Sequence, residues 1–272
     1  MNLRNKTIAF IGAGNMGEAL IRGLLAAKTV PSSRIIAADV RAERREYFMS
    51  SVGVQAINDN AEAVKAADIV LVAVKPQQMS EVLAGIKSAM SDSKLVVSIA
   101  AGVTTARVER ELGGRVRVVR VMPNTPALVG AGAAALAKGA NATDDDLTTA
   151  ERILGAVGIV VRVEESLMDA VTALSGSGPA YVFFVTEALS RAGVAAGLDE
   201  ALAKKLAIQT VSGAAKLMVE SGEEPESLRH KVTSPGGTTE AALKVLGEGK
   251  LVDLFARAIL AAQKRSRELS GS

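Results

Sequence analysis

The chain has 272 residues, which is enough for two domains, and 49% of them are hydrophobic, so a large core can form. It contains no cysteine, which excludes disulfides, thiolate catalysis and cysteine-based zinc sites. The net charge of +3 comes from interspersed charges without a basic stripe, which argues against nucleic-acid binding, and no apolar run is long enough to span a membrane.

The first predicted element is a dinucleotide-binding fingerprint. A short apolar strand at residues 7–11 is followed by G-A-G-N-M-G from Gly12 to Gly17 and then by an amphipathic helix. This is the order that a Rossmann fold needs: Gly12 makes the tight turn, Gly14 lets a pyrophosphate approach, and Gly17 lets the helix pack on the strand. The apolar run is too short, and too interrupted by glycines, to be a secretion signal.

The end of the second predicted strand bears on cofactor choice. The strand at 34–38 ends at Asp39, about twenty residues after the glycines, where an acidic group can bond the ribose 2′-hydroxyl of NAD. Arg41, Arg44 and Arg45 follow, and guanidinium groups suit the 2′-phosphate of NADP. These arginines are equally typical of a solvated helix face. The residues therefore leave NADH and NADPH both open.

Short strands and helices alternate up to about residue 162 and predict a doubly wound α/β domain. Further strands are expected at 52–56, 69–74, 95–99, 116–121, 133–137 and 159–163, with helices at 77–89, 106–112 and 144–156. Thr143, followed by three aspartates, is expected to cap the last of these helices. Arg115, Arg117 and Arg120 lie in or beside a strand and are interpreted as charges at a sheet edge.

Beyond about residue 164, helical patterns replace the strands, with breaks at 175–178, 197–199, 222–225 and 234–237. We therefore expect two domains, at 1–163 and 164–272. The helix after Pro179 is apolar on two faces, since Val182 and Phe183 lie off its main stripe. Such a helix is buried, and a partner subunit is a natural source of that burial in a domain of this size. The basic residues at 264–267 are interpreted as solvating the end of the last helix.

Candidate ligand-binding residues follow three strands, because α/β sheets bind ligands beyond the carboxyl ends of their strands. These segments are Lys75-Pro76-Gln77, the small residues 100–104, and the rigid M-P-N-T-P at 122–126. Lys75 can bond ribose or phosphate, although alone it is more simply a surface lysine. His230, the single histidine, is interpreted as incidental, and the sequence has no hydrolase triad, Walker lysine or metal-ligand cluster.

Residues 232–243, V-T-S-P-G-G-T-T-E-A-A-L, are the most informative segment. A turn runs into an apolar helix, and consecutive backbone N–H groups at such a junction form an anion-binding concavity. Thr238 or Thr239 can cap the helix, and either hydroxyl can face a ligand. Taken by itself, the segment is more simply interpreted as an ordinary turn. Because the same chain also carries a nucleotide fingerprint, the segment predicts a site for a small carboxylate with a polar atom next to it.

Together these segments closely resemble pyrroline-5-carboxylate reductase. The matching motifs span nearly the whole chain, at residues 10–16, 73–77, 100–103, 122–126, 169–181 and 232–243. The resemblance implies an α/β fold with an N-terminal Rossmann-like domain and a C-terminal all-helical dimerisation domain. It also implies a cytoplasmic enzyme of proline biosynthesis that reduces the cyclic imine 1-pyrroline-5-carboxylate to L-proline. The expected assembly is a homodimer with active sites that combine both chains, and some members form decamers.

The resemblance implies particular site residues. NADPH, slightly favoured, or NADH is expected on Gly12, Ala13, Gly14, Asn15, Met16, Asp39, Arg41, Asn60, Ala73, Val74, Lys75, Pro76, Ala100, Ala101 and Gly102. The substrate is expected on Glu165, Ser175, Gly237, Thr238 and Thr239. Thr239, beside the ring nitrogen, and Lys75 are the expected catalytic residues, and no metal is expected.

This chemistry agrees with the residues, because a protonated imine is already electrophilic and needs only a hydride donor, proximity, a carboxylate anchor and one hydrogen-bonding group. One departure is His230-Lys231, where the family often has an acidic–amide pair. Two alternatives remain: a β-hydroxyacid dehydrogenase, which would need a catalytic lysine in its helical domain, and a dinucleotide sensor without turnover, which would need a recognition module.

Overall fold

The computed structural model describes residues 3–270, and the chain divides into two compact units. The first unit comprises the residues up to Ser177 and those from Ala262 on, and the second is Gly178–Ala261. The sheet ends near residue 163, where we expect the domain boundary, but the first compact unit continues through further helical turns to Ser177.

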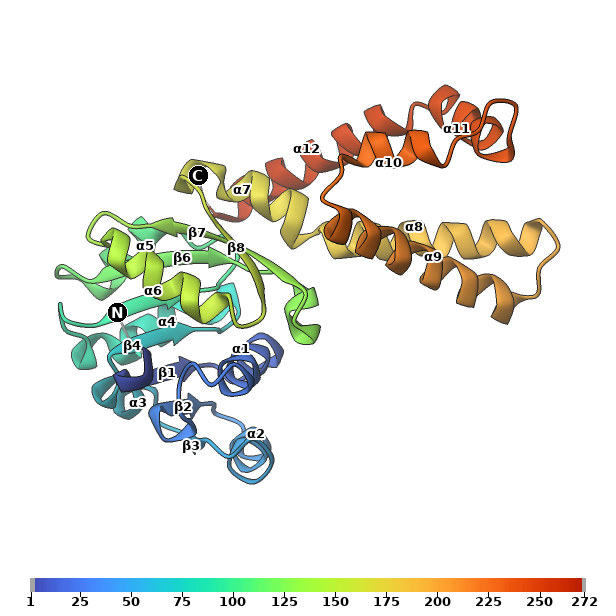
Figure 1. Ribbon diagram of the computed structural model, residues 1–272. Helices are drawn as coiled ribbons and strands as arrows, with labels where there is room; N and C mark the ends of the chain where they lie inside the picture. The colour runs from blue at the N-terminus through green and yellow to red at the C-terminus, as the bar shows by residue number, and fades with distance from the viewer. Residues whose placement is uncertain (1–2, 271–272) are drawn as a thin grey trace. The chain divides into compact units, whose positions relative to one another are not determined.

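The first unit is built on one sheet, in which the described residues form eight strands in the order β3-β2-β1-β4-β5-β6-β7-β8 (Figure 1). The strands are β1 (Ile8–Ile11), β2 (Ile35–Ala38), β3 (Gln55–Ile57), β4 (Ile69–Val72), β5 (Leu95–Ser98), β6 (Arg117–Met122), β7 (Gly132–Lys138) and β8 (Gly158–Arg162). Neighbours are parallel, except that β6 and β7 are antiparallel. Strand order reverses between β1 and β4, which is the switch point where such sheets bind ligands. The predicted doubly wound domain is confirmed.

Helices cover both faces of this sheet because alternate side chains of each strand enter two separate apolar layers. The layer that contains Phe10 includes residues of α1 (Asn15–Ala26) and α6 (Asp144–Leu154), and Phe48 just after α2 (Ala42–Tyr47). The layer that contains Ile11 includes residues of α3 (Asn60–Ala66), α4 (Met79–Ile86) and α5 (Thr105–Leu112). All residues of β1, β2, β4 and β5 are buried, which explains their continuous apolar runs.

Two sequence interpretations of the first unit need correction. The third strand begins at Gln55 rather than at residue 52, because Phe48–Val52 is a helical turn that ends at Gly53 with a left-handed φ of 75°. Arg120 is not an edge charge, because β6 lies between β5 and β7 and this residue is only 4% exposed. The cap at Thr143 is confirmed: its hydroxyl accepts a hydrogen bond from the Asp146 N–H, as part of a capping box.

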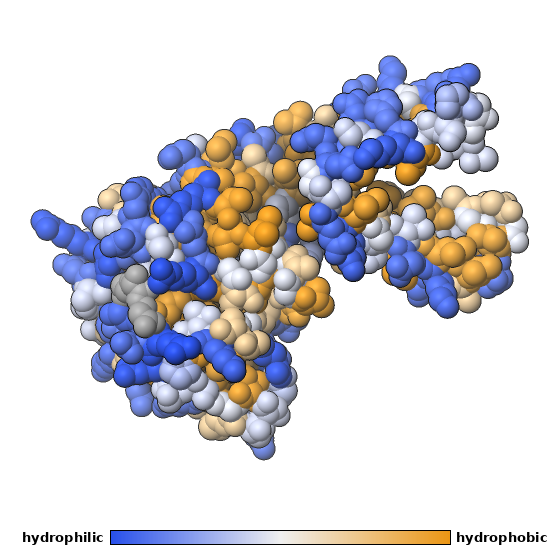
Figure 2. Space-filling view, in the orientation of Figure 1, coloured by the Kyte–Doolittle hydropathy of each residue, from blue (hydrophilic) through white to orange (hydrophobic). Residues whose placement is uncertain are grey.

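The second unit is all helical, as expected. It contains α8 (Gly178–Ala195), α9 (Glu200–Ser221), α10 (Pro225–Lys231), α11 (Thr238–Glu248) and most of α12 (Leu251–Ser270), whose last turns belong to the first unit. Among its described residues only Ala203 and Ala207 are buried. Phe183 and Phe184 on α8 are 67% and 69% exposed. Figure 2 shows hydrophobic residues on the surface of α8 and α9.

Candidate active site

The glycine-rich turn lies between β1 and α1, at the switch point of the sheet. Gly12 has a φ of +92°, and a Cβ there would lie 2.9 Å from the Ala73 carbonyl oxygen. A Cβ at Gly17 would lie 2.8 Å from the Gly12 carbonyl oxygen, whereas a Cβ at Gly14 would meet nothing within 4 Å. Two glycines therefore allow close packing, and the third leaves open space at the start of α1. The first N–H groups of that helix lack intrahelical acceptors and are suited to bind phosphate.

Asp39 directly follows β2, and its carboxylate is already fully bonded within the chain. The Ala13 N–H donates to it over 3.1 Å, and the Arg41 N–H, Nε and Nη2 donate over 3.0 Å each. Burial by itself would raise the pKa of Asp39, which is 7% exposed, but the hydrogen bonds from Arg41 and Ala13 hold that pKa below its ordinary value. Because a carboxylate has about four acceptor positions, a ribose hydroxyl would have to displace Arg41.

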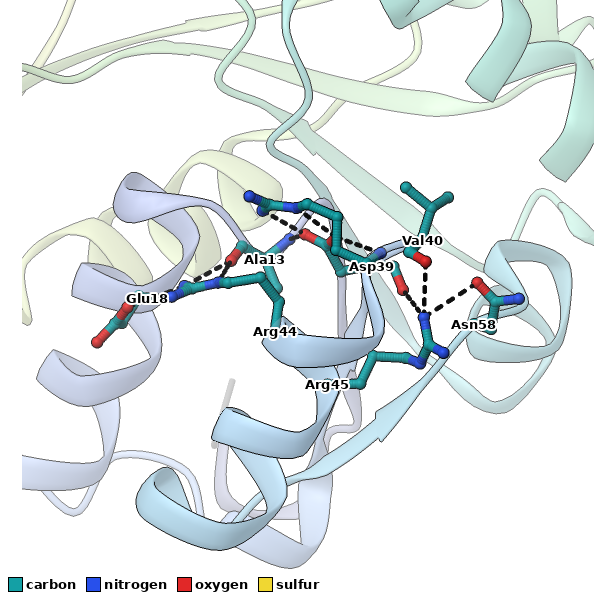
Figure 3. A network of polar contacts seen from close by, with 8 residues as sticks. Ala13, Glu18, Asp39, Val40, Arg44, Arg45 and Asn58 are labelled. Atoms are coloured by element: carbon teal, nitrogen blue, oxygen red, sulfur yellow. Dashed lines mark hydrogen bonds and ion pairs between the residues drawn. The ribbon is translucent and has the colours of Figure 1, made fainter.

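The three arginines after β2 differ in what they contact. Arg41 is bonded to Asp39, but its side chain is still 51% exposed. Arg44 donates to the Ala13 carbonyl oxygen and to Glu18 (Figure 3). Arg45 donates to the carbonyl oxygens of Asp39 and Val40 and to the Asn58 side chain. Arg44 and Arg45 therefore do not form a solvated helix face, and Arg41 is the arginine most available to a ligand.

Other predicted cofactor residues follow further strands of the parallel part of the sheet, at the same edge as the glycine-rich turn. Asn60 begins α3 after β3, Lys75 follows β4, and residues 100–102 follow β5. Ala100 and Gly102 are buried, and Gly102 has a φ of +72°. The Lys75 side chain is exposed and has no hydrogen-bond partner among residues 3–270. The fold thus gathers these residues at one edge, with a free ammonium group among them.

Glu165 and Ser175, two predicted substrate ligands, are engaged within the first unit. Glu165 accepts hydrogen bonds from the Thr105 N–H over 2.7 Å, from the Thr105 hydroxyl, and from Arg120 over 3.4 Å. The Asn124 amide donates to the carbonyl and hydroxyl oxygens of Ser175, over 3.3 Å each. Both carboxylate oxygens of Glu165 are therefore occupied, and the residue ties the start of α5 to β6.

In the second unit, α11 begins at Thr238, and Gly237 is its N-cap without a side-chain hydrogen bond. The expectation that a threonine hydroxyl caps this helix is therefore wrong. The Gly237 N–H donates to the Ser234 carbonyl oxygen over 3.0 Å, so it is not free to bind a carboxylate. The N–H groups of Thr238 and Thr239 belong to the first helical turn and have no intrahelical acceptor.

The surface beside this helix start is hollowed. A depression of about 600 Å³ is lined by residues that include Thr233, Gly236, Gly237 and Glu240. The Glu240 carboxylate accepts the Gly236 N–H over 2.7 Å. His230 is exposed and lies 3.7 Å from Glu226, in keeping with an incidental role. Thr238 and Thr239 are not among the residues that line the depression, and the N–H groups of Gly236 and Gly237 that line it are already bonded within the chain.

Two further polar contacts of the first unit do not follow from the sequence interpretation. Arg120, which is itself buried, pairs with the partly exposed Glu165, and the available signal was an arginine flanked by valines within a strand. The end of α12 is not simply a solvated tail, since Ser266 is buried and its hydroxyl donates to Asp169 over 2.6 Å. Within residues 3–270 there is no cluster of three or more histidine or acidic residues placed to hold a metal, and no helix there could cross a membrane.

Residues 165–269 match the family model for pyrroline-5-carboxylate reductase dimerisation, and residues 7–102 match the model for NADP oxidoreductase, coenzyme F420-dependent. The pyrroline-5-carboxylate reductase of Methanosarcina acetivorans is 46% identical over 98% of this chain and 99% of its own. That of Arabidopsis thaliana is 44% identical over 97% of this chain and 96% of its own. This chain belongs to the pyrroline-5-carboxylate reductase family.

Solved structures of the reductase family agree with this membership. The Coxiella burnetii enzyme has a TM-score of 0.93 and 42% identity, covering 97% of this chain and 98% of that one. The Plasmodium falciparum enzyme, solved with NADP bound, has a TM-score of 0.86 and 32% identity, covering 98% and 99%. A prephenate dehydrogenase from A. aeolicus, 15% identical with a TM-score of 0.54, shares the fold alone. Membership decides for the reductase over the β-hydroxyacid dehydrogenase that the sequence left as an alternative.

Proposed function

We propose that this protein reduces 1-pyrroline-5-carboxylate to L-proline with hydride from a nicotinamide cofactor, as the last step of proline biosynthesis in the cytoplasm. The observation that carries the proposal is the identity of 46% to a pyrroline-5-carboxylate reductase over 98% of the chain. The test is cofactor oxidation by the purified protein on addition of pyrroline-5-carboxylate, with proline identified as the product. A folded protein that binds NADPH but forms no proline would refute this function and favour a dinucleotide sensor.

The residues of the chain support a mechanism that depends on binding and orientation. The reduced nicotinamide, when bound, supplies the hydride, and a protonated cyclic imine accepts it without a strong protein acid. The free N–H groups at Thr238 and Thr239 bind the substrate carboxylate. The Thr239 hydroxyl oxygen accepts a hydrogen bond from the protonated ring nitrogen and so holds the ring in one orientation. Lys75, whose ammonium has no internal partner among the described residues, supplies positive charge to the cofactor.

We further propose a preference for NADPH that depends on Arg41. The Asp39 carboxylate has its acceptor positions filled, so it is a poor acceptor for the ribose hydroxyl of NADH. Arg41 is half exposed and can donate to a 2′-phosphate while it remains paired with Asp39. Asp39 also repels that phosphate, which limits the preference to a modest one.

The proposed assembly is a homodimer formed mainly by residues 164–272. The second unit buries few of its described residues, and α8 exposes both Phe183 and Phe184. A groove of about 640 Å³, lined by residues of α8 and α9 that include Val182, Phe183 and Ile208, offers further apolar surface. Exposure of this extent in a helical unit is typical of a surface that a second subunit covers.

A further inference from the structure

The peptide groups of Ala13, inside the glycine-rich turn, are held from both sides by the second strand–helix segment. The Ala13 N–H donates to the Asp39 carboxylate over 3.1 Å. The Ala13 carbonyl oxygen accepts two hydrogen bonds from Arg44, over 2.9 Å from Nε and 2.7 Å from Nη2. Figure 3 shows the Arg44 side chain extending from α2 to this carbonyl. Residues that lie 26 and 31 positions away in the chain thus fix the orientation of one turn residue.

Arg44 is itself held in place. Its Nη2 lies 2.9 Å from Glu18, and its guanidinium carbon lies 5.1 Å and 5.0 Å from the ring centres of Tyr47 and Phe48. Its side chain is 20% exposed, against 51% for Arg41. A planar guanidinium can form paired hydrogen bonds and stack on rings at the same time, which a lysine ammonium cannot.

The charge of Arg44 is balanced locally. Glu18 also accepts hydrogen bonds from the Tyr47 hydroxyl over 2.6 Å and from Arg22 over 2.9 Å. Burial would raise the pKa of Glu18, but the hydrogen bonds from Tyr47, Arg22 and Arg44 outweigh it and lower that pKa to about 2. Glu18 is therefore charged at neutral pH, and Arg44 is the partner of a carboxylate and a carbonyl rather than a free cation that awaits a phosphate.

We propose that Arg44 is a positioning residue for the dinucleotide, which acts by holding the Ala13 peptide and not by reading the 2′ position. The inference rests on the proposed function only in that a nicotinamide dinucleotide binds at this turn. NADH and NADPH share the pyrophosphate that the start of α1 is suited to receive. Loosening the turn should therefore weaken the binding of both cofactors by the same factor.

The test is Arg44→Lys, which keeps the positive charge but removes the paired hydrogen bonds and the stacking. We expect the Kd values of NADH and NADPH, measured by fluorescence titration without substrate, to rise about tenfold each, with a parallel rise in both KM values. The kcat and the KM for pyrroline-5-carboxylate should stay within about twofold of wild type. Since titration needs no turnover, the binding test stands even if the proposed reaction fails.

Arg45→Lys is the matched control, because Arg45 lies on the same helix and bonds two carbonyl oxygens but does not contact Ala13. It should leave both Kd values within about twofold of wild type. Unchanged affinity in a folded Arg44→Lys variant, or a loss confined to NADPH, would overturn the proposal. If Arg44→Lys does not fold, the test is Glu18→Gln, which weakens the contact that holds Arg44 in place. About threefold weaker binding of both cofactors would support the proposal, and unchanged binding would refute it.

Discussion

Replacing Glu165 by alanine should destabilise the first unit far more than the loss of an ordinary ion pair. Its partner Arg120 is 4% exposed on an inner strand, with the Nη1 atom 3.4 Å from the carboxylate. Truncation leaves this charge buried without a counter-ion, which costs about 3–5 kcal/mol of unfolding free energy. The Thr105 N–H also loses its acceptor at the start of α5. A pair at the surface contributes about 1 kcal/mol or less.

Urea unfolding followed by circular dichroism, at one fixed protein concentration, measures this loss. Glu151→Ala, which removes the partner of the more exposed Arg162, is the control and should cost about 1 kcal/mol or less. The double variant Glu165→Leu with Arg120→Met should regain much of the stability, because an apolar pair leaves no stranded charge. A Glu165→Ala variant as stable as the control, or a double variant no better than the single one, would contradict this account of the pair.

Four further outcomes are expected. Thr239→Val should lower kcat by about tenfold to a hundredfold, the equivalent of a lost hydrogen bond to a charged group, without changing the Kd of NADPH; wild-type kinetics would refute the role of its hydroxyl. Arg41→Ala should raise the KM of NADPH more than that of NADH, and equal rises would mean that it does not read the 2′ position. Phe184→Asp should give an unfolded or inactive protein, and wild type should sediment as a dimer at equilibrium; a stable, active wild-type monomer would contradict the interface. Because the pKa of Glu18 is lowered from 4.5 to about 2, its contribution to stability is present above pH 4.5 and is lost as the pH falls toward 2; Tm measured against pH should therefore fall less steeply over this range in Glu18→Gln.

The strands and the glycine-rich turn are readable from the sequence because their causes are local. Buried parallel strands need continuous apolar runs, and each of the eight expected runs contains a strand of the structure or overlaps one. Glycine is needed at positions 12 and 17 because a Cβ there would lie too close to backbone atoms. At Gly17 these atoms belong to the same strand–turn–helix unit, and at Gly12 they belong to the segment after the neighbouring strand. The third strand was placed too early because Val52 and Val54 have β-propensity, while the left-handed Gly53 between them ends a helix.

The partners of polar side chains were decided by tertiary structure. Nothing near Arg120 in the sequence indicates Glu165, which lies 45 residues away, and nothing near Arg44 indicates the carbonyl of Ala13. Ser266 and Asp169 are 97 residues apart in the sequence, so the basic composition of the last helix could not show that its end packs against the first unit. Backbone propensity and hydrophobic period act over a few residues, whereas the partner of a buried charge depends on which strands and helices the fold places side by side.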